Sequence, residues 1–128
     1  MRRASVELRV IYGDTDQMGV VYYANYLRYF EASRGELIRA GGKSYGDLEK
    51  AGYLLPVIEA HVRYFKPARY DDLITVEVTV EKVRGASVRF VYRVTRGDEL
   101  LAEGATEHAC IGPGGRPARL PAELRAML

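Results

Sequence analysis

The segment from Tyr12 to Tyr26 reads YGDTDQMGVVYYANY and places two aspartates and two glycines between two stretches of regular hydrophobic spacing. Before it, from Val6 to Tyr12, apolar and polar residues alternate, which is the pattern of a half-buried strand. After it, from Tyr26 to Arg39, apolar residues recur at helical spacing and charged residues fill the other face. The segment is therefore a junction between a strand and a helix, and its acidic residues need an explanation.

The expected helix carries further signals. The Gly41–Gly42 pair favours its end. Gly35 lies inside it at a cost of about 1 kcal/mol relative to alanine, so we expect a close approach of another backbone there. Glu31 lies beside the apolar stripe, and its simplest interpretation is a surface salt bridge to Arg28 or Arg34, each three residues away.

The rest of the chain is strand-like, with a tail that ends the sheet. Short turn signals separate the last three strands, so we expect hairpins and an antiparallel meander. The polar stretch before the strands can hold a short helix, and the final residues can hold one helical turn. The expected strands cover Leu55–Phe65, Ile74–Val80, Val88–Val94 and a segment after Asp98; the hairpin breaks are Arg84–Ala86 and Arg96–Asp98, the short helix lies within Ser44–Gly52, and the tail runs from Gly112 to Pro121.

These elements predict one α+β domain over residues 1–128, with a five-stranded antiparallel sheet wrapped around one long central helix. One helix does not cover such a sheet fully. We therefore expect the uncovered face and the free sheet edge to pair with another subunit.

The composition excludes several classes of protein. Lysine and arginine total 19 against 17 acidic residues, a surplus too small for the basic face of a nucleic-acid-binding protein. Arginine outnumbers lysine, which suits a phosphate-bearing ligand, and biased codon usage explains it equally well. Cys110 is the only cysteine, so no internal disulfide is expected. The start lacks a secretory apolar run, and no window reaches the roughly 18 apolar residues of a membrane span, so we expect a cytoplasmic protein.

The junction carries a family resemblance. The motif D-x-D-x-x-G-x-V-Y-x-x-N-Y, from Asp14 to Tyr26, together with the amphipathic helix after it, resembles the signature of hotdog-fold acyl-CoA thioesterases. The most similar groups are the 4-hydroxybenzoyl-CoA thioesterases and the short-chain acyl-CoA thioesterases associated with the Tol-Pal system. The resemblance continues through VRYFKPARYDD (Val62–Asp72) and the strands to GATEHACI, so it covers nearly the whole chain. It implies a hotdog fold and an acyl-CoA substrate, with no metal or redox cofactor.

The resemblance also assigns two catalytic roles at the junction. The second aspartate, Asp16, is the catalytic carboxylate, and the backbone N–H of Tyr23 binds the thioester carbonyl at the start of the helix. Such an arrangement is chemically sound, because free N–H groups at a helix start, aided by the helix dipole, stabilise the negative charge that a thioester oxygen gains under attack. An ordinary aspartate is ionised at neutral pH. Asp16 is therefore ready to attack the carbonyl or to activate a water, and the sequence leaves both roles open.

The other residues of the junction have simpler interpretations. Asp14 is expected to cap the helix or make a turn. Gly13 and Gly19 let the connection turn, and Gly19 and Val20 are assigned to substrate binding. The Tol-Pal-associated members usually carry a histidine where this chain has Tyr23, so a histidine-assisted mechanism is not carried over. The aromatic residue resembles the 4-hydroxybenzoyl group more closely, and the role of its hydroxyl stays open.

Basic residues on the strands are candidates for the phosphates of coenzyme A. Members of the family hold these phosphates with arginine and lysine, often from a neighbouring subunit. The candidates in this sequence are Arg63, Lys66, Arg84 and Arg89. For each one alone, a solvated charge at a strand end is the competing interpretation.

The histidines and the cysteine do not suggest a further site. His61 and His108 are far apart in sequence and have no third ligand at zinc-like spacing, so no metal site is expected. Cys110 has His108 two residues away on the same strand face, an arrangement that does not activate a thiol, and is expected to be a small buried hydrophobe.

The sequence therefore predicts hydrolysis of an acyl-CoA to a free acid and coenzyme A by a homodimer, or a homotetramer built as a dimer of dimers, with active sites shared between chains. Enoyl-CoA hydration on the same fold is one alternative, but the aspartate–histidine pair of hotdog hydratases is absent near Asp16. A non-catalytic module that binds acyl-CoA or an acyl carrier protein is another, because fold alone does not decide function. The identity of the acyl group is not predicted.

Overall fold

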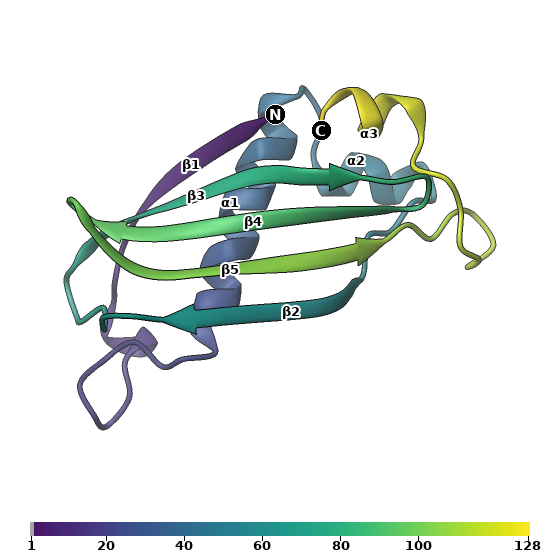
Figure 1. Ribbon diagram of the computed structural model, residues 1–128. Helices are drawn as coiled ribbons and strands as arrows, with labels where there is room; N and C mark the ends of the chain where they lie inside the picture. The colour runs from purple at the N-terminus through teal and green to yellow at the C-terminus, as the bar shows by residue number, and fades with distance from the viewer. Residues whose placement is uncertain (1) are drawn as a thin grey trace.

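A computed structural model describes residues 2–128 (Figure 1). In chain order its elements are β1 (Arg3–Arg9), the 3-10 turn η1 (Tyr12–Asp14), α1 (Asn25–Ala40), α2 (Tyr45–Lys50), β2 (Val57–Tyr64), β3 (Leu73–Val83), β4 (Ser87–Arg96), β5 (Glu99–Ala109) and α3 (Ala122–Ala126). No helix formed by residues 2–128 combines the length and the apolar run needed to cross a bilayer.

The five strands form one antiparallel sheet in the order β1-β3-β4-β5-β2. β3, β4 and β5 are the predicted meander, with tight turns between them. Apolar residues alternate along β3 and β4, so each strand buries one face in the core. The buried side chains of these two strands are Ile74, Val76, Val78, Val80, Val88, Phe90, Tyr92 and Val94. The five-stranded antiparallel sheet expected from the sequence is confirmed.

The helix α1 packs across one face of the sheet (Figure 1) and is the only long helix within residues 2–128. Its apolar stripe includes the fully buried Phe30 and Ile38. The Phe30 ring stacks on that of Tyr92, with 4.2 Å between the ring centroids and 4° between the ring planes. The helix ends at the predicted Gly41–Gly42 pair.

The two short helices lie where the sequence allowed them. α2 begins with a capping box, in which the Ser44 side chain accepts from the Asp47 N–H and the Asp47 carboxylate accepts from the Ser44 N–H. α3 follows Pro121 and buries Leu124. Both short helices therefore lie within the stretches where the sequence predicted them.

The first strand is shorter than predicted. It ends at Arg9, and Tyr12 lies in η1 with 74% of its surface exposed. The chain leaves the sheet because the N–H groups of Asp14 and Thr15 turn back to the carbonyls of Ile11 and Tyr12. The alternation of apolar residues therefore continues beyond the strand, and Tyr12 instead stacks on Tyr70, with 4.0 Å between ring centroids.

Two expectations for α1 were also wrong. Glu31 forms no ion pair among the described residues, because Arg28 reaches the carboxylate of Asp14 and Arg34 turns into the core. Gly35 meets no backbone of another element: a Cβ added there would have its nearest neighbours in the guanidinium of Arg39, at 3.4 Å.

The buried Arg34 starts a chain of hydrogen bonds through the core. Its guanidinium donates to the hydroxyl of Tyr92 at 3.1 Å, which pairs with the Thr106 hydroxyl at 2.5 Å. Thr106 in turn lies 2.9 Å from Nε2 of His108, whose Nδ1 lies 2.9 Å from the Leu55 carbonyl oxygen. Burial lowers the pKa of His108 to about 4, so the ring is neutral at pH 7. Since a carbonyl only accepts, Nδ1 carries the proton and Nε2 accepts from Thr106.

Candidate active site

The loop between β1 and α1 is anchored by a buried carboxylate. Asp14 is 6% exposed and accepts hydrogen bonds from the hydroxyl of Tyr29 at 2.9 Å and the guanidinium of Arg28 at 3.2 Å. Its backbone carbonyl accepts from the Asn25 side chain and from the Tyr22 N–H, both at 2.9 Å. Asp14 therefore ties the loop to the first turns of α1, in agreement with a structural role.

Asp16 lies in a tight turn at the tip of this loop. Its N–H donates to the Val20 carbonyl at 3.0 Å, and its own carbonyl accepts from the Gly19 N–H at 2.9 Å. One carboxylate oxygen, Oδ1, accepts from the Met18 N–H at 2.9 Å. Gly19 has a φ of 79°, a left-handed conformation that side chains disfavour. The second carboxylate oxygen, Oδ2, has no partner within residues 2–128, which leaves a lone pair for a substrate or a water.

The start of α1 presents free donors. The N-cap position is Ala24, whose side chain cannot satisfy the first N–H groups of the helix. Within residues 2–128, the backbone N–H groups of Tyr23 and Ala24 donate to no protein acceptor, whereas the next one, on Asn25, donates to the Tyr22 carbonyl at 2.9 Å. A helix start of this kind stabilises negative charge through free N–H groups and the helix dipole.

These groups meet at a cavity of about 270 Å³. Asp16 and Met18 contribute from the loop tip, and four aromatic residues contribute from α1, its preceding turn, the end of β2 and the position directly after β2. Its lining consists of Asp16, Met18, Val20, Val21, Tyr23, Tyr26, Tyr64, Phe65, Lys66 and Pro67. The cavity therefore combines one carboxylate with a largely apolar, aromatic wall, as small-molecule sites commonly do.

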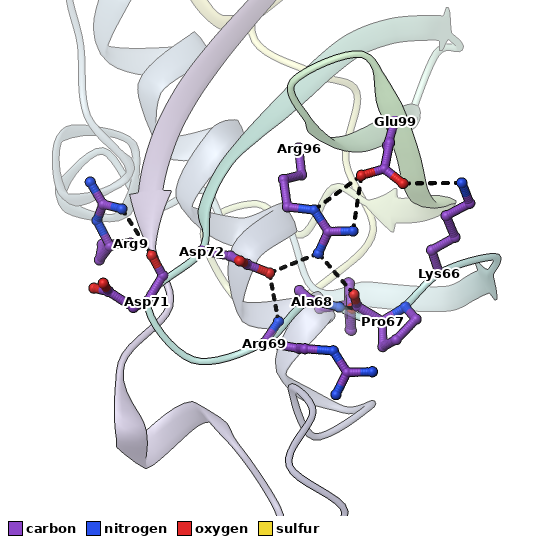
Figure 2. A network of polar contacts seen from close by, with 10 residues as sticks. Arg9, Lys66, Pro67, Ala68, Arg69, Asp71, Asp72, Arg96 and Glu99 are labelled. Carbon is purple, nitrogen blue, oxygen red and sulfur yellow. Dashed lines mark hydrogen bonds and ion pairs between the residues drawn. The ribbon is translucent and has the colours of Figure 1, made fainter.

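The wall formed by the connection between β2 and β3 is held by an arginine (Figure 2). Arg96 donates from Nη1 to the Pro67 carbonyl at 3.1 Å and to the Asp72 carboxylate at 2.8 Å. It also binds the Glu99 carboxylate, which accepts from Lys66 at 3.0 Å. Although burial opposes it, bonds from the Arg69 N–H and from Arg96 lower the pKa of Asp72. The network ties this largely exposed connection to Arg96 at the end of β4 and Glu99 at the start of β5.

The candidate phosphate-binding residues are spread over the sheet. Lys66 lines the cavity, and its side chain is 57% exposed beside Glu99. Arg63 is exposed on β2, opposite Glu103 in register. Arg84 lies in the turn after β3 and pairs with Glu107 at 2.7 Å. In the single chain, therefore, only Lys66 of this group lies beside Asp16.

Arg89 also lies away from the cavity. It pairs with Glu81 at 2.9 Å and approaches Glu59 and Glu107. Together with Arg84 it lines a separate groove at the far end of β3. Neither arginine lines the cavity that contains Asp16 in the same chain.

The cysteine and the two histidines do not line the Asp16 cavity, and only Cys110 and His108 are buried in the core. Cys110 is fully buried, and burial raises the pKa of its thiol. His108 belongs to the core chain of hydrogen bonds, and His61 lies on the edge strand β2. No group of three potential metal ligands forms within residues 2–128.

Sequence reasoning missed most of the cavity wall. Tyr26 was assigned to the helix without a role, and Tyr64, Phe65 and Pro67 were placed only in a strand and a matching segment. The available signal was the aromatic pair Tyr64 and Phe65 with Pro67 two residues later, because proline is excluded from the interior of a central strand and aromatic side chains commonly line ligand pockets. The positions of these side chains relative to Asp16 depend on the fold.

Comparison with known proteins agrees with this geometry. Residues 10–128 match the model of the Thioesterase-like superfamily. The acyl-CoA thioesterase YbgC of Haemophilus influenzae is 36% identical over 124 residues, which cover 95% of this chain and 91% of that protein. A DHNA-CoA thioesterase from Staphylococcus aureus is 35% identical with a TM-score of 0.89, over 94% of this chain and 82% of that one.

A mutant 4-hydroxybenzoyl-CoA thioesterase, solved in complex with 4-hydroxybenzoyl-CoA, shares the fold with a TM-score of 0.87 at 22% identity, over 99% of both chains. The likeness at that level of identity concerns the fold. Together with the motif of the loop and the arrangement of strands, these matches establish the family. The chain belongs to the Thioesterase-like superfamily, and the expected membership of the hotdog-fold acyl-CoA thioesterases is confirmed.

Proposed function

We propose that the protein hydrolyses an acyl-CoA thioester to a free acid and coenzyme A, with Asp16 as nucleophile or general base. The observation that carries the proposal is the cavity itself, because its lining includes both Asp16 and Tyr23, the residue directly before the N-cap of α1. The names of the relatives, which are thioesterases acting on acyl-CoA esters, support the same reaction.

The chemistry follows from these two groups. The thioester carbonyl oxygen accepts from the Tyr23 N–H, so the charge that develops on it is stabilised. As general base, Asp16 takes a proton from a water whose oxygen attacks the carbonyl carbon; as nucleophile, it attacks that carbon directly and water then cleaves the resulting anhydride. In both routes the C–S bond breaks and the thiolate of coenzyme A leaves and takes up a proton. No electrons change hands, so the proposed reaction needs no redox cofactor. We also propose that it uses no metal, because the Tyr23 N–H supplies the stabilisation of the oxyanion and Asp16 supplies the base or nucleophile.

The two rival functions receive less support. Hotdog enoyl-CoA hydratases resemble one another in pairing the aspartate with a nearby histidine, and the lining of this cavity contains no histidine. A pure binding module would need no free carboxylate oxygen at the start of a helix. The thioesterase names of the relatives likewise favour hydrolysis.

Assembly is part of the proposal. β2 forms a sheet edge, and nearly all of its residues are exposed, including Val57 at 49% and Ile58 at 62%. An exposed apolar edge strand normally pairs or is covered. We propose a homodimer, or a dimer of dimers, in which the sheet wraps around α1 as the central helix and a neighbouring chain supplies basic residues for the coenzyme A phosphates. Light scattering at micromolar concentration tests it, and a monomer would contradict it.

The test of the reaction is thiol release from a panel of short aliphatic, long aliphatic and aromatic acyl-CoAs. Asp16→Asn should lower turnover by roughly two to four orders of magnitude and leave the fold intact, because it removes the base or nucleophile but keeps the shape. Asp98→Asn, in the exposed β4–β5 turn, is the matched control and should be unchanged. Near-normal turnover by Asp16→Asn would contradict the catalytic role of Asp16. A wild type that releases no thiol from any of the substrates would contradict the proposed acyl-CoA hydrolysis.

A further inference from the structure

A tyrosine of β2 contacts the turn that begins α1. The hydroxyl of Tyr64 donates a hydrogen bond to the carbonyl oxygen of Tyr23 at 2.8 Å. Tyr64 is the last residue of β2, and Tyr23 lies directly before the N-cap of α1. The bond thus links the sheet edge to the helix start, two parts of the cavity wall that are 41 residues apart in the chain.

This bond determines the direction of an N–H group. The Tyr23 carbonyl and the Ala24 N–H belong to one planar, trans peptide group, so they point in opposite directions and rotate together. Within residues 2–128, the only other donor to this carbonyl is the Tyr26 N–H, at a long 3.4 Å. Tyr64 therefore makes the shorter of the two hydrogen bonds to this peptide group, whose N–H, that of Ala24, has no protein acceptor of its own within residues 2–128.

The Tyr64 side chain is well placed to act as a donor. Its ring lies edge-on to the ring of the buried Tyr26, with centroids 5.2 Å apart and an interplanar angle of 80°. Burial raises the pKa of Tyr64, so its hydroxyl keeps its proton at neutral pH. The ring contact and the hydroxyl bond together hold the side chain against the helix start.

We propose that Tyr64 is a positioning residue for thioester hydrolysis: by holding the Tyr23 carbonyl, it aims the Ala24 N–H beside the Tyr23 N–H at the thioester oxygen. The inference rests on the function proposed above and adds to it a second donor and the residue that orients that donor. Two converging N–H groups bind a developing oxyanion better than one, because each is already oriented when the charge appears.

The variant Tyr64→Phe removes the hydroxyl and keeps the ring contact with Tyr26. Loss of an oxyanion donor typically lowers kcat by 10²–10³-fold, and a donor that is present but poorly aimed should cost less. We expect kcat to fall about 10-fold, KM to change less than about twofold, and the thermal unfolding midpoint to move by no more than about 3 °C. Tyr70→Phe, which alters an exposed tyrosine stacked on Tyr12, is the matched control and should match the wild type.

A second readout measures polarisation without turnover. An acyl-CoA analogue with a CH₂ in place of the thioester sulfur and ¹³C at its carbonyl binds but is not hydrolysed. In the wild type its bound carbonyl resonance should move downfield of the free value, and in Tyr64→Phe that displacement should shrink. Hydrolysis by the wild type with unchanged kcat and carbonyl shift in Tyr64→Phe would overturn this inference alone. A wild type without hydrolysis would overturn the proposed function and the inference with it.

Discussion

The hydroxyl of Tyr29 donates a 2.9 Å hydrogen bond to the carboxylate of Asp14, at the buried base of the loop that carries Asp16. Burial and the neighbouring carboxylate raise the pKa of Tyr29, so the hydroxyl is a permanent donor. The two aspartates of the motif thus have different surroundings. Asp14 is buried and fixes the loop, whereas Asp16 lines the cavity.

Tyr29→Phe tests this difference. It leaves the Asp14 carboxylate buried with one side-chain donor fewer, so we expect the free energy of unfolding to fall by about 1–3 kcal/mol. Because the loop then loosens, turnover should fall about 10-fold as Asp16 loses its alignment. Urea unfolding and thiol release measure the two effects. Tyr53→Phe is the control, since the Tyr53 hydroxyl has no hydrogen-bond partner within residues 2–128; equal stability of the two variants would contradict the anchoring role of Asp14.

Gly19 tests the turn at the tip of the loop. Its φ is 79°, so Gly19→Ala should cost about 1 kcal/mol of stability through backbone strain. Gly42, with a φ of 97° at the end of α1, would carry the same strain as alanine but lies outside the loop that holds Asp16. We expect both alanine variants to lose similar stability, but only Gly19→Ala to lose turnover, by about 10-fold. Similar activity in both variants would show that the turn does not position Asp16.

Much of the fold could be predicted because the spacing of hydrophobic residues within a short segment is enough to identify a single strand or helix. The alternation from Ile74 to Val80 marks a strand with one buried face, and the glycines at 41 and 42 mark the end of α1. The prediction that the first strand extends to Tyr12 was wrong, because residues can alternate between apolar and polar without pairing with a neighbouring strand. At Tyr12 the chain turns back on itself and leaves the sheet. The prediction that Arg34 lies on the solvated face of the helix was wrong. Its guanidinium is buried because the hydroxyl of Tyr92 provides a hydrogen-bond partner in the core.

The site likewise has one part that the sequence could predict and one that it could not. The motif pointed to the loop and the helix start, since strand, acid and helix are adjacent in sequence. Tyr64 and Arg96 could not be placed, because their roles arise from contacts with Tyr23 and with Pro67, residues distant in the chain. Such contacts depend on the strand order, in which β2 pairs with β5 at the edge, and hydrophobic spacing carries no information on that order.

Arg96 offers a test of the cavity wall. Arg96→Lys keeps the charge but loses the planar fork that reaches Pro67, Asp72 and Glu99 together. The wall segment should then shift, so we expect KM to rise about 3- to 10-fold while kcat changes less than about threefold. Steady-state kinetics on the preferred acyl-CoA measure both. Arg93→Lys, on the exposed face of β4, is the matched control, and an equal rise in KM for both variants would argue against a role for the wall.

The buried His108 predicts a loss of stability in mild acid. Its pKa is about 4 in the folded protein and about 6.5 in an unfolded chain, so the folded state disfavours the proton. Its contribution to stability is complete above pH 6.5 and is lost as the pH falls toward 4, because the unfolded state then binds a proton that the folded state refuses. Between pH 7.5 and 4.5 this linkage should remove about 2 kcal/mol from the free energy of unfolding.

His108→Gln separates this effect from the titration of carboxylates. Glutamine can donate toward Leu55 and accept from Thr106 without titrating, so the variant should be less stable at pH 7.5 but should lose about 2 kcal/mol less than the wild type on the way to pH 4.5. Urea unfolding at half-unit pH intervals gives both curves. If the stability of the two proteins falls in parallel as the pH is lowered, the folded wild type accepts a proton on His108. In that case Nε2 of His108 donates to the Thr106 hydroxyl instead of accepting from it.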